Sequence, residues 1–294
     1  MQSPGRYKID RLISAVPSTA YDKQYKVIFS DGRYVTLSGS DTIAVSYYEW
    51  SEDRDTNVVA LQQLLSIKSK SKSLYVDLKN VCLDAEVELP LDPYLLGALI
   101  GDGGMTSRAT VFTSADTEIL EEVSRLLPRG HKLTKKAGTN YDYLVSKPVE
   151  ARSNLVTGIT RDLGVRVRSE FKSIPDVYMQ ASASQKLRLI NGLMDTDGTA
   201  CKAGSVSFSS TSPKLARQVQ SLIRQLGGIA SISEKKPSYT YLGERRAGLL
   251  AYNVNTRFKS PSSLFFLPRK RATAKDRNQY SDSLKLRIDS VKEI

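Results

Sequence analysis

The chain has 294 residues with 40% apolar and 8% aromatic side chains, a composition typical of a folded protein and not of a disordered one. Its length allows one large domain or two ordinary ones. A single histidine leaves no histidine cluster for zinc, and two distant cysteines fit neither a disulfide framework nor a CxxC metal site.

The net charge of +12 is unevenly distributed along the chain. Residues 1–90 hold 11 Lys and Arg against 12 Asp and Glu, whereas residues 91–294 hold 32 against 19. A basic domain of this kind favours nucleic acid as its partner. No apolar run has the length of a membrane span and the N-terminus lacks a signal-peptide core, so we expect an intracellular protein, cytoplasmic or encoded by a phage in a host cytoplasm, with no membrane partner.

Short strands are predicted over residues 1–50. The sequence YKVIFSDGRYVTLSG (25–39) predicts a hairpin around Asp31-Gly32. VVALQQLLSI (58–67) predicts a short helix and LYVDLKNVCL (74–83) another strand. Pro90 and Pro93, together with the change in charge, place a domain boundary near residue 88.

An internal repeat occupies the rest of the chain. YLLGALIGDGG (94–104) is answered by RLINGLMDTDGT (188–199), and each copy is followed by a strand, a helix and two polar strands. The two copies keep their register over about 95 residues. They predict an α+β pseudo-dimer, because a solenoid would need more repeats.

The repeated segment combines small residues with a carboxylate at a helix end. Gly97 and Gly101 lie four apart on one helix face, and Gly192 and Thr196 repeat this spacing, so the two helices can approach closely. Asp102 and Asp197 would then meet, each against the negative end of a helix dipole. Such a carboxylate pair repels itself unless a cation bridges it, and hard divalent ions prefer these oxygen ligands.

LLGALIGDG and INGLMDTDG resemble the paired motifs of the LAGLIDADG homing endonucleases, although Ile100-Gly101 replaces the consensus Asp-Ala in the first copy. EFKSIPDVYM (170–179) and LARQVQSLIRQLGG (215–228) resemble further segments of the intein-associated branch. The resemblance covers roughly residues 88–280. It implies two αββαββα repeats, about 89–180 and 181–284, in an endonuclease domain spanning 89–284.

The family implies site-specific hydrolysis of both strands of a long double-stranded DNA target by a monomer with Mg²⁺ or Mn²⁺. The expected metal-binding residues are Asp102, Asp197, Gly101 and Thr196. A lysine beside each metal would orient water or offset developing negative charge. Lys172 matches the lysine segment of the family, and Lys270, in FFLPRKRA, is the corresponding candidate after the second motif, with a role in a basic run that meets phosphates as its alternative.

Polar side chains that alternate along strands are typical of a sheet that reads DNA. The expected DNA-binding residues are Lys132, Thr134, Lys135, Lys136, Ser231, Ser233, Lys235, Lys236, Tyr239, Tyr241, Arg245, Arg246, Arg269 and Arg271. A solvated strand face is the alternative for each of them.

Residues 1–88, and YKVIFSDGRYVTLSGSDTIAV (25–45) above all, resemble a β-rich intein splicing domain, but Ser38–Thr42 lacks the histidine that this family expects. The chain begins with Met1, no His-Asn precedes DSVKEI, and residues 285–294 form a tail that resembles an intein strand. We therefore expect a relic splicing domain and a freestanding endonuclease. The alternatives are a DNA-binding regulator without catalysis and an RNA maturase.

Overall fold

The computed structural model describes residues 23–47, 56–61, 64, 73–78, 85–201, 205–241, 243–274, 276 and 284–294. The chain divides into two compact units, of which unit 1 takes residues 1–79 and 278–294 and unit 2 takes residues 80–277. These bounds differ from the expected boundaries at 88 and 284. The segment after unit 2 belongs to unit 1, because residues 285–293 form a strand of its sheet.

Unit 1 is a six-stranded sheet with the order β2-β1-β16-β5-β3-β4. Its strands are β1 (Gln24–Phe29), β2 (Tyr34–Ser38), β3 (Thr42–Tyr47), β4 (Thr56–Ala60), β5 (Leu74–Asp77) and β16 (Lys285–Glu293). β1 and β2 form the predicted hairpin, and its turn uses Gly32 at a φ of 81°, where a side chain would be strained. β16 pairs antiparallel with both β1 and β5, so a late segment of the chain lies inside the sheet.

The helix predicted over residues 58–67 is wrong at its start. Val58, Val59 and Ala60 belong to β4, where they pair with Ala44, Ile43 and Thr42 of β3. β-Branched residues favour such pairing, and the preceding strand, which lies outside the helical pattern, overrides it. Leu61 and Leu64 are helical and buried. The other residues of that segment, and residues 79–83 of the strand predicted over 74–83, lie outside the described residues.

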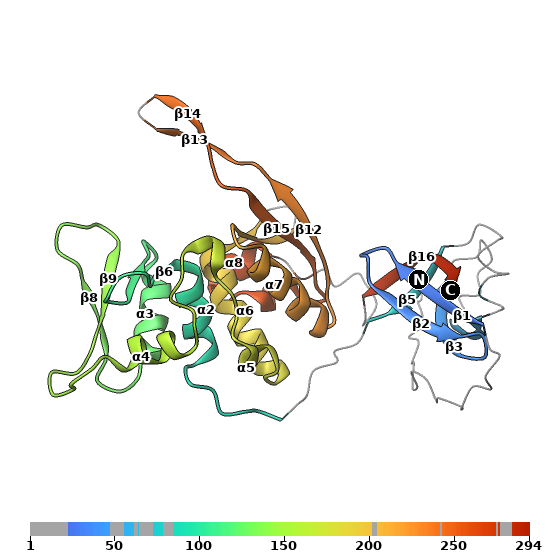
Figure 1. Ribbon diagram of the computed structural model, residues 1–294, viewed down its shortest axis with the longest axis horizontal. Helices are drawn as coiled ribbons and strands as arrows, with labels where there is room; N and C mark the ends of the chain where they lie inside the picture. The colour runs from blue at the N-terminus through green and yellow to red at the C-terminus, as the bar shows by residue number, and fades with distance from the viewer. Residues whose placement is uncertain are drawn as a thin grey trace. The chain divides into compact units, whose positions relative to one another are not determined.

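Unit 2 contains two halves with the same order of elements (Figure 1). The first half comprises α2 (Pro93–Asp102), β6 (Gly103–Gly104), β7 (Val111–Thr113), α3 (Thr117–Leu126), β8 (Lys132–Lys135), β9 (Asp142–Ser146) and α4 (Leu155–Asp162). A linking segment holds η1 (Ser169–Phe171) and α5 (Asp176–Met179). The second half comprises α6 (Ala183–Asp197), β10 (Gly198–Ala200), β11 (Val206–Ser210), α7 (Pro213–Gln225), β12 (Ile229–Lys235), β15 (Ala251–Arg257), η2 (Pro261–Leu264) and α8 (Pro268–Thr273).

The two four-stranded sheets have matching strand orders, β6-β7-β9-β8 and β10-β11-β15-β12. This confirms the predicted α+β fold with two αββαββα repeats and a small β-rich unit. The halves differ in one insertion, since the second carries a two-stranded ribbon, β13 (Ser238–Tyr241) and β14 (Glu244–Ala247), between β12 and β15. The ribbon projects beyond the ends of these two strands (Figure 1).

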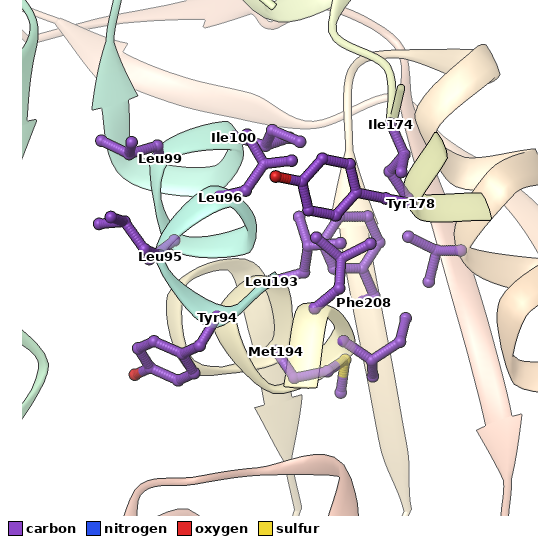
Figure 2. Close-up of a cluster of buried hydrophobic side chains, with 14 of the residues drawn as sticks. Tyr94, Leu95, Leu96, Leu99, Ile100, Ile174, Tyr178, Leu193, Met194 and Phe208 are labelled. Atoms are coloured by element: carbon purple, nitrogen blue, oxygen red, sulfur yellow. The ribbon is translucent and has the colours of Figure 1, made fainter. Parts of the chain in front are cut away.

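The core of unit 2 is built around the packed pair α2 and α6. Leu96 and Ile100 of α2 face Tyr178 and Leu193, whereas Leu95 and Leu99 face the other way (Figure 2). α2 is therefore apolar on every side, as expected of a fully buried helix. Asp92 caps its start with bonds from the backbone N–H groups of Tyr94 and Leu95. No helix in the described ranges has the length and apolar character to cross a membrane.

Candidate functional site

The small residues of α2 and α6 lie against each other, as the four-residue spacing predicted. A Cβ atom built on Gly97 would lie 2.3 Å from the carbonyl oxygen of Leu189, and one built on Gly192 would lie 2.3 Å from that of Tyr94. Both distances are far inside van der Waals contact. Glycine at these positions therefore lets the two backbones touch, and the helices share an interface along their length.

One turn further on, the C-terminal ends of both helices meet. A Cβ atom on Gly101 would lie 2.0 Å from Thr196 Oγ1 and 3.3 Å from Asp197 Oδ2. Asp102 and Asp197 are the final residues of α2 and α6. The structure thus brings the two candidate metal-binding carboxylates to one place, where each faces the negatively polarised end of its own helix.

Both carboxyl groups resist ionisation in this setting. Burial raises the pKa of Asp102. Burial and the neighbouring charge of Asp102 together raise the pKa of Asp197 to about 6, while Lys172 and Lys270 act in the opposite direction. Two partly buried carboxyl groups, of which one opposes the ionisation of the other, form a pair that a bound cation would stabilise.

The two candidate lysines lie at the ends of these helices. Lys172 Nζ donates to the carbonyl oxygen of Gly101 at 2.7 Å. Lys270 Nζ donates to the carbonyl oxygens of Met194, Asp195 and Gly198 at 2.9, 2.6 and 2.8 Å. Burial lowers the pKa of both lysines, and the nearby aspartates raise it. Each half therefore holds one ammonium against backbone carbonyls at or next to its own helix end.

The carboxylate of Asp195 is a site feature that the sequence did not single out. Its side chain is buried, with Oδ2 accepting from the Tyr94 hydroxyl at 2.9 Å and from the backbone N–H groups of Phe266 and Leu267 at 3.2 Å each. Burial raises its pKa to about 6. The sequence does hold one sign of a special role for Asp195, because the two repeats differ at this position and the first copy has Ile100 there.

The carboxylate oxygens of Asp102 and Asp197 are donors of the kind that suits a divalent ion. Among the described residues, no group of three or more His, Cys, Asp and Glu side chains is placed to hold a metal. Magnesium sites often use one or two carboxylates with water and substrate phosphate, which matches the pair Asp102 and Asp197. The other two expected ligands have different partners here: the Gly101 carbonyl accepts from Lys172, and the Thr196 hydroxyl donates to carbonyls of its own helix.

The strand residues expected to bind DNA have the predicted alternation. Lys132 and Thr134 in β8, and Ser231 and Ser233 in β12, are exposed, and the intervening Leu133 and Ile232 are half-buried. The other exposed members of the set are Lys135, Lys136, Lys235, Lys236, Arg245, Arg246, Arg269 and Arg271. The side chains of Tyr239 and Tyr241 in β13 lie outside the description.

Arg269, which the sequence suggested as a residue that binds DNA phosphate, has a partner within the protein. Its guanidinium forms an ion pair with Asp116, which caps α3 in the other half of unit 2. The Arg269 side chain pulls the pKa of Asp116 below its usual range. α8 therefore joins the halves, with Arg269 attached to the first and Lys270 to the second.

The chain is similar to known proteins in sequence and in structure. Residues 184–254 match the model of the LAGLIDADG-like domain. A replicative DNA helicase DnaB from Mycobacterium intracellulare is 28% identical in an alignment of 283 residues that covers 90% of this chain, and the chain spans 43% of that protein's length. A solved structure of mesophilic variants of the homing endonuclease I-DmoI is 17% identical, with a TM-score of 0.40 over 62% of this chain and 95% of that one.

The matched segment holds α6, the second sheet up to β15 and the helix α7, which together carry the second copy of the motif and its Asp197. The first half repeats these elements in the same order. The family match confirms the resemblance inferred from the second motif: residues 184–254 match a LAGLIDADG-like domain.

Proposed function

We propose that the chain is a site-specific double-strand DNA endonuclease of the homing type. The observation that carries this proposal is the meeting of Asp102 and Asp197 at the paired ends of α2 and α6, with one lysine held beside each helix end. Hydrolysis of a phosphodiester requires no histidine or cysteine at such a site. LAGLIDADG homing endonucleases are DNA endonucleases, which supports this activity class for the matched domain.

Asp102 and Asp197 would hold the divalent ions, and a bound ion would activate water and neutralise charge on the phosphate oxygens. The chain's own groups would complete the site. Lys172 and Lys270 each have an Nζ near the carboxylate pair, where a cation offsets charge that develops in the transition state. Because their pKa values are lowered, both lysines lose a proton more readily than an exposed lysine and are better suited to exchange a proton with water.

The exposed polar faces of β8 and β12 support a role in DNA binding. Both faces alternate outward polar residues with inward apolar ones, and the excess positive charge of the chain lies in this part of the sequence. Such strands suit groove recognition, in which phosphate contacts position the protein and side chains read base edges.

The helicase similarity supports an intein-like origin. An intein lies inside a host protein, so a match of 90% of this chain to 43% of a larger protein is what that relationship predicts. The match includes both units. We infer that unit 1 is the counterpart of a splicing domain, interrupted by the nuclease unit between β5 and β16, and we propose no helicase activity for the chain.

Cleavage of a randomised plasmid library tests the proposal, with double-strand ends mapped by sequencing in Mg²⁺ and in chelator. Asp102→Asn and Asp197→Asn should each abolish Mg²⁺-dependent ends while DNA binding survives. Asp162→Asn, which changes an exposed carboxylate on α4, is the matched control and should cleave normally. Tight binding without cleavage would support a regulator, preference for structured RNA would support a maturase, and activity in either site variant would refute the metal assignment.

A further inference from the structure

Asp195 ties three separate segments of unit 2 together. Its carboxylate is 2% exposed and accepts all of its hydrogen bonds from outside its own helix. One comes from the Tyr94 hydroxyl on α2, and the others come from the backbone N–H groups of Phe266 and Leu267. A buried carboxylate with these donors fixes the path of the backbone that supplies them.

That backbone leads directly into α8. Leu267 is the residue that precedes the helix, and Pro268 at the first helical position fixes the entry angle. Lys270 follows three residues after Leu267, and its Nζ reaches the carbonyl oxygen of Asp195 at 2.6 Å. Asp195 therefore acts at both ends of a short connection, since its side chain holds the entry to α8 and its main chain accepts from the lysine.

The other lysine is held by different groups. The side chain of Gln218 on α7 binds both backbone groups of Ile174. Its Oε1 accepts from the N–H and its Nε2 donates to the carbonyl oxygen, both at 2.8 Å. The Ser212 hydroxyl donates to the carbonyl oxygen of Lys172 itself. These supports are neutral, and Ile100 stands where a counterpart of Asp195 would be in the first repeat.

We propose that Asp195 is a positioning residue dedicated to Lys270, and that Gln218 performs the corresponding task for Lys172. The two candidate lysines are thus held by independent devices, one ionic and one neutral. The consequence for cleavage rests on the proposed nuclease function: loss of Asp195 affects the reaction that Lys270 serves and leaves the other intact.

Lysine reactivity in metal-free, DNA-free protein tests the positioning directly. The full-length chain is treated with acetyl N-hydroxysuccinimide, and the acylation rates of Lys172 and Lys270 are measured in the same sample by mass spectrometry. Asp195→Asn should raise the acylation rate at Lys270 relative to that at Lys172 by about tenfold. This factor corresponds to the loss of one charge-assisted hydrogen bond that the Asp195 carboxylate accepts. Gln218→Leu should change the ratio in the opposite direction by about fivefold.

An unchanged ratio, or an equal rise at both lysines, would overturn the proposal, because general loosening does not discriminate between them. If Asp195→Asn fails to fold, Tyr94→Phe keeps the buried ring, removes one hydrogen bond to Asp195 and should give a smaller shift of the same sign. In the cleavage assay, Asp195→Asn should slow the hydrolysis of the same DNA strand whose hydrolysis Lys270→Met slows. Absence of cleavage by the wild-type chain refutes the nuclease function, whereas the reactivity ratio still decides the role of Asp195.

Discussion

Replacement of Gly97 by alanine tests the helix interface on which the site depends. The new Cβ atom would lie 2.3 Å from the carbonyl oxygen of Leu189, and such contacts are essentially never below 3.0 Å, so α2 and α6 must separate locally by at least 0.7 Å. The obstructing atom belongs to the backbone of a buried helix and cannot rotate away. Overpacking of this kind costs about 3 kcal/mol, offset by about 1 kcal/mol from the better helix propensity of alanine.

The net loss of about 2 kcal/mol corresponds to a fall in Tm of about 4–8 °C for a unit of this size. Gly158→Ala is the matched control, because Gly158 lies inside α4 with nothing within 4 Å of its missing Cβ. That variant should gain about 0.5–1 kcal/mol and melt about 1–4 °C higher. Differential scanning calorimetry of the full chain measures both, and a Gly97→Ala protein as stable as the wild type would refute the close approach of the helices.

Three further predictions concern stability and binding. Glu122 accepts hydrogen bonds from Arg125 and Arg188, which lower its pKa, so Glu122→Gln should reduce the free energy of unfolding by about 1–3 kcal/mol at pH 7. The difference in stability between wild type and variant should shrink as the pH falls below 4.5 and through the lowered pKa of Glu122. Equal shifts of the urea midpoint at pH 7 and pH 3.5 would contradict this prediction. Ser182→Ala removes the capping box of α6 and should lower the stability by about 1 kcal/mol, which a urea titration detects; no change would mean that the box is dispensable. Replacing both Arg245 and Arg246 by alanine should reduce the slope of log K against log salt for duplex DNA by about 2 without changing Tm, and an unchanged slope would remove the ribbon from the phosphate contacts.

The parts of the site that depend on local spacing could be predicted from the sequence. A four-residue interval places Gly97 and Gly101 on one helix face whatever the rest of the fold does, and the second copy repeats it, so the helix interface followed from the pattern alone. The aspartate at each helix end followed from the same register. Lys172 was found through family resemblance and Lys270 as its counterpart after the second motif, and the structure brings both lysines to these helix ends.

Features that depend on distant pairing could not be predicted in this way. The entry of Val58 and Val59 into β4 depends on β3, and a helical pattern was the wrong guide. The ion pair of Arg269 with Asp116 joins residues 153 positions apart, so a basic run read in isolation suggested a free phosphate ligand. Asp195 looked like one more motif residue until the donors from Phe266 and Leu267 were placed beside it.

The position of β16 between β1 and β5 has a consequence for the order of events during synthesis. A ribosome completes all of unit 2 before it makes the strand that joins β1 and β5, so the unit 1 sheet has two open edges during the time in which unit 2 can already fold. Open edges template pairing with other chains. Aggregation during expression should therefore originate in unit 1, and a β16 peptide supplied in trans should suppress it.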